Sequence, residues 1–369
     1  MIEVYHVIYF NLLLYLIILF LGYNSLKSNK ITKQNFQIMF FLFVIFCMYP
    51  AWGGDYFHYR DQFPVVKKGG LTHMEDVYIY IIRNIASNYL MFRIIVWGGA
   101  TYLLFQAYKY TNIDARLAML TFSLLFLPRF SYARASLAMA MSYLGLSLII
   151  TEKKKRNLIL GSILLFGSFF FHKSALFGIA VVLLTIFVSE RLGKKTLIMI
   201  LAVFPFLIAA ATYFLSDFLL LDADEFELLN VEKGQQYLTE EALNKGLAAK
   251  MGEMLMRLTF YSILIEYIIL HFKGLYSKLP KTVKAYSTAS FFTIYISSLF
   301  AFDLGVSTQV IYNRFIFFAM IPSACFIAYC LKAGLLKKWT KIVIALGVCS
   351  VLFALLYSCY LAPDSPYQW

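Results

Sequence analysis

The chain is a succession of apolar runs separated by short polar turns, and this pattern constrains the fold more than any other feature. A helix needs about 20 apolar residues to cross the ~30 Å hydrocarbon core of a bilayer, and about twelve runs approach that length. Hydrophobic residues make up 61% of the 369 residues and charged residues 14%, which is more apolar than a soluble domain requires. The sequence therefore predicts an all-α polytopic integral membrane protein with about 12 transmembrane helices. The candidate spans are 4–23, 36–52, 89–108, 117–130, 134–150, 157–171, 174–189, 196–216, 254–272, 286–302, 314–331 and 341–361.

Two polar segments are much longer than the other turns, residues 53–88 and 217–252. Long loops of this kind often carry binding residues. In the first, the apolar spacing from Tyr78 to Ile85 predicts a short amphipathic helix that lies along the membrane interface. The second is acidic, and its Thr239 can cap a further helix.

Nothing in the sequence divides the chain, which has no internal repeat, low-complexity tract or proline-rich linker. We expect a single transmembrane domain over residues 1–369. The first apolar run is not preceded by a basic segment and lacks a small-residue cleavage site, which predicts an uncleaved span rather than a signal peptide.

Most of the 33 lysines and arginines fall in alternate turns, and these turns hold few acids. Basic turns of a membrane protein face the cytoplasm, so the alternation predicts that both termini and both long loops are external. Because the net charge of +13 is explained by topology, we expect no nucleic-acid partner. The basic turns are 27–33, 109–116, 153–156, 191–195, 273–284 and 332–341.

Several arginines stand at the ends of apolar runs or inside them. The stretch 128–138 places Arg129 and Arg134 between two runs, Arg314 opens a later run, and Arg257 lies within another. An arginine at the bilayer centre costs roughly 2.5–3.5 kcal/mol on insertion scales, so such residues usually have a function. A planar guanidinium can bind two phosphate oxygens at once. The alternatives are an arginine that extends to lipid headgroups and, for Arg257, a structural pair with another helix.

His172 and Ser174 lie in the turn between two later runs, at the same predicted membrane face as Arg134. Imidazole titrates near neutral pH, so His172 can act as a base or as a hydrogen-bond donor. The alternative is an interfacial histidine bonded to a backbone carbonyl. Asp55 is a second candidate base, because partial burial makes a carboxylate more basic. The alternative for Asp55 is a turn-forming role after two glycines.

The five cysteines all lie within or at the ends of apolar runs, and neither a Cys-x-x-Cys nor a His-x-x-x-His motif occurs. Their odd number and their spacing argue against a disulfide framework or a zinc site. We therefore expect no cofactor and a metal-independent site, in which arginines take the place of a divalent cation.

Four short motifs, distributed between about positions 50 and 330, carry a further indication. They are Gly54-Asp55-Tyr56-x-x-Tyr59, Arg134 with Ala138 at a helix start, His172-x-Ser174-Ala175-Leu176, and Tyr312-x-Arg314. Together they resemble the EpsG/Wzy-type family of bacterial polysaccharide polymerases. The family often has Gln after the arginine, where this chain has Ala135, so we assign no role to that position.

This resemblance implies a membrane glycosyltransferase with a GT-C-like fold. It implies a growing glycan on undecaprenyl diphosphate as the donor and a second lipid-linked repeat unit as the acceptor. Arg134, His172 and Asp55 would then be catalytic. The substrate-binding residues would be Arg129, Arg314, Tyr56, Tyr59, Arg60, Arg257 and Ser174.

The resemblance also implies a multi-pass location in the bacterial inner (plasma) membrane, with the reaction at the external face. Its product would be a surface polysaccharide such as O-antigen, capsule or exopolysaccharide. Further partners would be the lipid bilayer, a chain-length regulator and a flippase of the same pathway. Two alternatives are a lipid-linked glycan ligase and a flippase or transporter of lipid-linked sugars. The gathering of polar residues at one predicted face favours the enzyme over the transporter.

Overall fold

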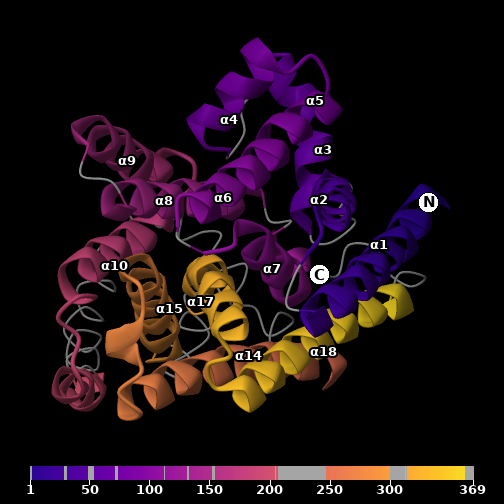
Figure 1. The fold of residues 1–369 in the computed structure, drawn as a ribbon. Coiled ribbons are helices and arrows are strands. Elements are labelled where there is room, and N and C mark those ends of the chain that lie inside the picture. The colour runs from indigo at the N-terminus through magenta and orange to yellow at the C-terminus, as the bar shows by residue number, and fades with distance from the viewer. Residues whose placement is uncertain are drawn as a thin grey trace.

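The structure is a computed structural model, and all of its regular elements are helices (Figure 1), with no strand among the residues it describes. Those residues are 2–28, 31–48, 54–70, 74–111, 113–130, 133–151, 154–203, 205–206, 247–299, 312 and 314–361. The elements before residue 111 are α1 (Ile2–Ser28), α2 (Lys33–Met48), α3 (Gly54–Lys67), α4 (Asp76–Tyr80), the π-helix η1 (Ile81–Ile85), α5 (Tyr89–Arg93), the π-helix η2 (Ile94–Gly98) and α6 (Gly99–Lys109). The later elements are α7 (Ala115–Phe130), α8 (Ala133–Thr151), α9 (Lys155–Gly167), η3 (Ser168–Phe170), α10 (Ala175–Val188), a helix over 194–203, α14 (Leu247–Phe272), η5 (Tyr276–Lys278), α15 (Lys281–Leu299), η6 (Phe317–Ala319), α17 (Met320–Ala333) and α18 (Lys337–Leu361).

Helices overlap every span expected from the sequence, although they differ in length. Among the described residues, 5 helices are long and apolar enough to cross a membrane: Tyr9–Lys27, Tyr89–Lys109, Met251–Phe272, Arg314–Ala333 and Lys337–Tyr357. Shorter apolar helices are Lys33–Cys47, Ala135–Thr151 and Ala175–Val188. The fold is thus that of a multi-helix membrane protein. The total of about 12 crossings and the GT-C-like arrangement stay predictions.

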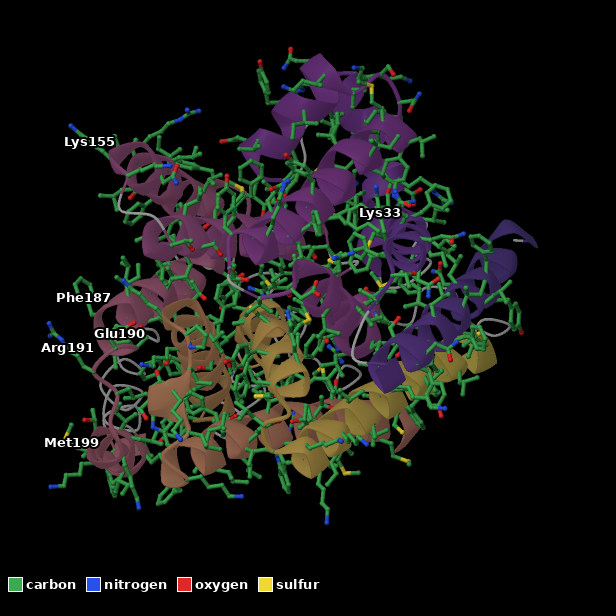
Figure 2. All side chains as sticks on the ribbon, in the orientation of Figure 1. Lys33, Lys155, Phe187, Glu190, Arg191 and Met199 are labelled. Atoms are coloured by element: carbon green, nitrogen blue, oxygen red, sulfur yellow. The ribbon has the colours of Figure 1, made fainter. Side chains whose placement is uncertain are left out.

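The centre of the bundle is formed by α7 and α17, which bury nearly all of their described side chains. Outer helices pack on them, with Phe126 of α7 stacked on Phe260 of α14 at 5.3 Å between ring centroids. At the periphery large apolar side chains face outward, as Phe187 (71% exposed) and Met199 (59%) do at the edge of Figure 2. Such a surface suits a hydrocarbon environment better than water.

The helices α8 and α9 approach each other more closely than ordinary side chains allow. A Cβ atom added at Gly145 would lie 2.7 Å from the carbonyl oxygen of Gly161. Small residues of α8 permit further close contacts. One example is the hydrogen bond that Ser142 Oγ donates to Ser168 Oγ at 3.0 Å. Small residues at helix interfaces are typical of membrane bundles, in which backbones pack together without a strong hydrophobic driving force.

Four of the six basic turns are joined in two pairs that are distant in sequence. Thr151 Oγ1 donates to the carbonyl of Tyr110 at 2.7 Å, and the Tyr276 hydroxyl donates to the carbonyl of Ser189 at 2.8 Å. Lys194 also lies over the ring of Phe272, 4.7 Å from its centroid. That all six basic turns lie at one end of the fold and face the cytoplasm stays a prediction.

The described residues of the segment expected as the first external loop, 54–70 and 74–88, form the helices α3, α4 and η1, and α4 lies with α5 at the top of Figure 1. Lys67, the last residue of α3, donates to three carbonyl oxygens of η1 and its end at 2.8–3.2 Å. In return, Arg83 of η1 donates to the carbonyls of Val66 and Gly70, each at 3.2 Å. Each cation thus donates to carbonyl groups near the end of the neighbouring helix.

The amphipathic helix predicted from Tyr78 to Ile85 is correct only in part. Tyr78, Ile81 and Ile82 are buried, but Ile85 is 47% exposed. The prediction assumed α-helical spacing, whereas residues 81–85 form a π-helix. Its i→i+5 bonding rotates later side chains away from the α-helical face.

The second long loop, 217–252, lies outside the described residues up to position 246, including Thr239. The helix α14 begins at Leu247, so the last residues of that segment are helical and continue directly into an apolar span.

We expect cysteine labelling to separate the two ends of the bundle. Of the native cysteines, Cys349 is exposed and the other four are buried, so single cysteines should be introduced after replacing Cys349 by Ser. With an impermeant maleimide on intact cells, Lys154→Cys should be protected and Lys68→Cys should react, because basic turns stay inside. A reagent that crosses the membrane should label both. Reaction at position 154 with protection at position 68 would reverse the assigned orientation.

Candidate functional site

The segment that leads into α17 receives side chains from several helices at the end of the bundle opposite the basic turns. Phe177 of α10 stacks on Phe315 with ring centroids 4.0 Å apart and an interplanar angle of 6°. Arg129, near the end of α7, lies over the ring of Phe317, 5.8 Å from its centroid. The ends of α7 and α10 therefore meet at the residues that precede α17.

Close packing fixes this segment in position. The Tyr143 hydroxyl of α8 donates to the carbonyl of Phe318 at 2.6 Å. A Cβ atom added at Gly178 of α10 would lie only 2.4 Å from a carbon of the Phe318 ring. The absence of a side chain at Gly178 is thus what allows α10 to touch η6.

Two arginines from different helices influence the electrostatic environment of Tyr312. This residue is fully buried and precedes the segment 314–319 in the chain. The guanidinium carbon of Arg257, in α14, lies 4.9 Å from the centroid of the Tyr312 ring. Burial raises the pKa of the Tyr312 hydroxyl, Tyr261 and Glu253 raise it further, and the positive charges of Arg257 and Arg129 oppose that rise. Arg129 and Arg257 therefore share one electrostatic environment, although they were predicted separately.

Two guanidinium groups and one carboxylate, that of Glu253, surround Tyr312. Two positive charges in a partly desolvated place interact with a negative group more strongly than they would in water. Guanidinium groups also present parallel donors that match phosphate oxygens. The structure thus brings together two of the predicted phosphate-binding residues, and Tyr312 connects them.

His172 and Ser174 form a hydrogen-bonded unit at the start of α10. The Nδ1 atom of His172 accepts a hydrogen bond from the Ser174 backbone nitrogen at 3.1 Å and also contacts Ser174 Oγ. A nitrogen that accepts from a backbone N–H carries no proton, so the neutral ring carries its proton on Nε2. In this arrangement Nε2 can donate a hydrogen bond, whereas the lone pair that a base would use is already engaged.

Aromatic contacts connect α3, α4 and α5 to this turn. Tyr78 of α4 packs edge-on against Phe171, the residue before His172, at 6.1 Å between centroids. Phe92 contacts both Tyr78 and Tyr59, at 6.2 and 6.3 Å. The Tyr59 ring is 1% exposed, so the structure places it inside this packing rather than on the surface.

The remaining predicted residues lie as follows. Asp55 and Tyr56 are in the first turn of α3, and Arg134 is the second residue of α8, but their side chains are outside the described part. Arg60 is exposed and pairs with Asp61 at 3.2 Å. Arg314 is exposed at the start of its helical segment. The structure does not bring Arg60 into the environment of Tyr312.

Arg93 is a buried cation that the sequence analysis did not single out. It is 2% exposed, donates through Nη2 to the Cys47 carbonyl at 3.1 Å, and lies over the Trp97 ring at 5.2 Å. A charged residue inside the apolar run 89–108 was the signal that could have identified it. Its contacts close the end of α2, which indicates a structural role.

No group of three or more His, Cys, Asp or Glu side chains that could hold a metal ion occurs in the described part of the chain. The acidic loop contains two carboxylates separated by one residue, those of Asp222 and Asp224. Both lie outside the described part of the chain. Metal independence therefore stays a prediction.

Apolar helices long enough to cross a bilayer define a polytopic membrane protein, and Arg257 and Arg129 lie over neighbouring aromatic rings at one end of its bundle. A family model described as the EpsG family matches residues 34–369, nearly the whole chain, and the chain belongs to this family. Membership confirms the family expected from the short motifs and implies a membrane polysaccharide polymerase-type function. Comparisons with curated proteins and with solved structures found no match.

Proposed function

We propose that this protein polymerises oligosaccharide repeat units carried on undecaprenyl diphosphate, at the external face of a bacterial inner membrane. The observation that carries the proposal is the position of two arginines on neighbouring rings, Arg257 over Tyr312 and Arg129 over Phe317. A diphosphate leaving group needs positive charge where its bond to the sugar breaks. Family membership supplies the reaction class, and the paired arginines supply the chemistry for the leaving group.

In the proposed reaction, a hydroxyl oxygen of the acceptor repeat unit attacks the anomeric carbon of the donor glycan. The bond from that carbon to the diphosphate oxygen breaks, and the polyprenyl diphosphate leaves with the electron pair. The hydroxyl proton passes to a base of the protein. Arg129, Arg257 and the predicted Arg134 and Arg314 neutralise the departing diphosphate.

The hydrogen bonds of His172 favour a division of labour between the two candidate bases. With Nδ1 engaged by Ser174, the ring presents Nε2–H as a donor to a substrate oxygen. The base is then Asp55, which α3 carries at its first turn. Tyr78 and Phe171 connect the external helices to the His172 turn, which supports both groups serving one site.

A transporter of lipid-linked sugars needs a polar path through both leaflets. Here the central helices α7 and α17 bury apolar side chains along their lengths, and Arg129 and Tyr312 lie at one end. This distribution favours an enzyme that works at one face. A glycan ligase would share the donor site and differ only in its acceptor.

The decisive experiment combines purified full-length protein with a lipid-linked repeat unit and examines the products on a gel. We expect a ladder of glycans whose steps equal one repeat unit, and we expect it to persist in excess EDTA, because the arginines provide the charge that a metal would otherwise supply. Loss in EDTA with recovery on adding magnesium would contradict metal independence. Movement of the intact substrate between leaflets without any longer glycan would instead identify a transporter.

A further inference from the structure

Three prolines of the described part of the chain lie within an apolar helix or directly after one. A proline has no N–H, so it cannot donate to the carbonyl four residues before it, and its ring crowds that carbonyl. Pro128 lies in the last turn of α7, Pro322 near the start of α17, and Pro205 just after the helix over 194–203. The carbonyls that lose their helical donor belong to Leu124, Phe318 and Leu201.

A tyrosine hydroxyl from another helix donates to each of these carbonyls. Tyr15 of α1 donates to the carbonyl of Leu124 at 2.7 Å, and Tyr143 of α8 donates to that of Phe318 at 2.6 Å. Tyr295 of α15 makes the third bond of this kind, at 2.8 Å. Tyr15 and Tyr143 are fully buried, where a backbone carbonyl needs a partner from within the protein. Each hydroxyl therefore takes the place of the N–H that the proline lacks.

Two of these three prolines belong to the central helices that meet at the candidate site. The helices α7 and α17 pack against each other (Figure 1). Arg129 directly follows Pro128 and lies over the ring of Phe317, which directly precedes the carbonyl that Tyr143 contacts. Residues 317–319 form a short 3-10 turn, a local change of winding that often marks a functional position in a helix. Both partners of the contact between Arg129 and Phe317 therefore adjoin a residue that a proline and a tyrosine control.

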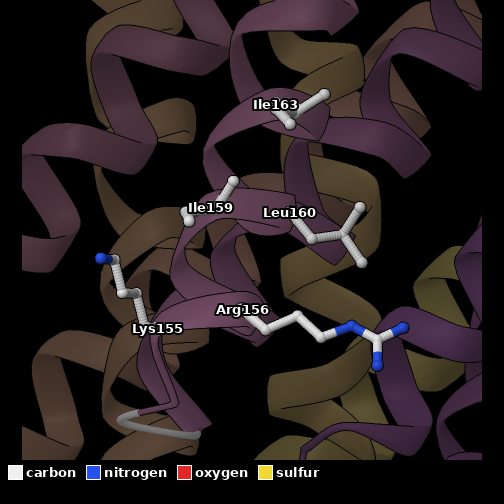
Figure 3. A pocket seen from close by; sticks show the side chains of 5 residues that line it. All are labelled: Lys155, Arg156, Ile159, Leu160 and Ile163. Atoms are coloured by element: carbon white, nitrogen blue, oxygen red, sulfur yellow. The ribbon is translucent and has the colours of Figure 1, made fainter.

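Only bonds between different helices can determine how those helices meet. The shallow pocket in Figure 3 is lined by α9 alone, with Lys155 and Arg156 pointing to opposite sides of it, so it cannot have this effect. The bonds from Tyr15 and Tyr143 instead tie each central helix to a second helix, α1 or α8. They are thus placed to fix the ends of α7 and α17 at the site.

A third tyrosine offers a comparison in the same helix. Tyr108 of α6 donates to the carbonyl of Ile321 at 3.0 Å, and it is as buried as Tyr143. The residue four positions after Ile321 is Cys325, which lies within α17 and has an N–H. The carbonyl of Ile321 therefore keeps its helical donor, and the bond from Tyr108 replaces nothing that a proline removed.

We infer that Tyr15 and Tyr143 are positioning residues for polymerisation. Each hydroxyl holds the carbonyl that a proline leaves without its helical donor, and the two bonds together set the position of Arg129 relative to Phe317. Because Arg129 acts there on the leaving diphosphate, this role rests on the proposed function. The replacement of a missing N–H by a tyrosine hydroxyl does not depend on it.

Rates of glycan-ladder growth by purified full-length variants test the positioning role. We expect Tyr15→Phe and Tyr143→Phe each to slow growth by about ten-fold, because a small displacement of a group that stabilises the transition state is costly. Tyr108→Phe is the matched control and should polymerise at the wild-type rate. A wild-type rate for either of the first two variants, or equal losses in all three, would overturn the role.

A double-mutant cycle distinguishes positioning from a general weakening of the fold. In the background of Arg129→Gln, Tyr143→Phe should slow the reaction by about two-fold or less, because the guanidinium that it positions is gone. The same result is expected for Tyr15→Phe. A tyrosine that only stabilises the protein would slow the reaction by the same factor in both backgrounds, and this outcome would overturn the inference.

The replacement of the missing N–H can be tested without the reaction. Tyr143→Phe should lower the melting temperature in detergent, and the loss should be several-fold smaller in the background of Pro322→Ala, whose N–H can donate to Phe318 instead. Tyr15→Phe with Pro128→Ala provides a second, independent cycle.

Equal losses of melting temperature in both backgrounds would show that the tyrosines do not replace a donor that the prolines lack, and would overturn the inference even if polymerisation is observed. An absent glycan ladder in wild type would refute the polymerase, and the positioning role with it, even where both melting-temperature cycles give the expected result.

Discussion

Arg257→Lys should reduce polymerisation roughly ten- to a hundred-fold while the protein inserts and accumulates normally. One charge-assisted contact to a phosphate oxygen contributes on the order of 1.5–3 kcal/mol, which corresponds to that change in rate if it acts in the transition state. Arg257 lies over the Tyr312 ring, and this stacking holds a planar group in one orientation. Lysine keeps the charge but neither stacks in the same way nor presents two parallel donors.

The measurement is the rate of glycan-ladder growth at matched amounts of purified protein. Arg116→Lys is the control, because Arg116 is exposed in a basic turn and pairs with Asp114 at 3.8 Å. It should polymerise at the wild-type rate. A normal rate for Arg257→Lys would mean that charge suffices at this position or that Arg257 has no contact with the diphosphate. The same reasoning applies to Arg134, whose replacement by lysine we also expect to be inactive.

Gly178→Ala should decrease polymerisation by about a hundred-fold, although it adds only one methyl group. The new Cβ would lie 2.4 and 2.5 Å from two carbons of the buried Phe318 ring, so this ring must shift, and we expect η6 and Phe317 to shift with it. Arg129 lies over Phe317, and a displacement of about 1 Å at a site can cost a hundred-fold in rate. A variant whose packing absorbs the methyl group would remain active and would show that the position of η6 does not matter.

A matched control separates this effect from a general intolerance of larger residues. Gly99 is also a glycine within a helix, and a Cβ atom there would meet nothing within 4 Å. Gly99→Ala should therefore leave the rate unchanged. Melting temperature in detergent should be recorded for both variants, because overpacking typically costs 1–3 kcal/mol. Equal inactivation of both would contradict the specific role of Gly178.

Much of the fold follows from the sequence because the helices coincide with apolar runs. Each run needs its backbone hydrogen bonds satisfied within itself in a bilayer, so its length and position predict a helix without knowledge of its neighbours. The π-helix at 81–85 did not follow, since a change from i→i+4 to i→i+5 bonding leaves no mark on composition. The hydrogen bonds from Lys67 to backbone carbonyls could not be predicted either. Every residue carries a carbonyl group, so the sequence does not show which ones a lysine will contact.

The individual residues of the candidate site could be predicted from the sequence, but their arrangement around one another could not. Arg129 and Arg257 each stood out as a charge among apolar residues. Their meeting at Tyr312 depends on three distant segments that pack together, and no spacing in the sequence encodes it. His172 and Ser174 are neighbours in the chain, so their motif could be predicted, but which ring nitrogen the serine engages required coordinates.

The bonds that hold α3 against η1 also determine how the outer helices respond to acid. Lys67 and Arg83 donate to peptide carbonyls rather than to carboxylates. A carboxylate loses its charge when protonated, and an ion pair then weakens, whereas a peptide carbonyl does not titrate in this range. Acidification therefore leaves these acceptors intact. In an acidic medium, a joint of this kind keeps its shape where a salt bridge would loosen.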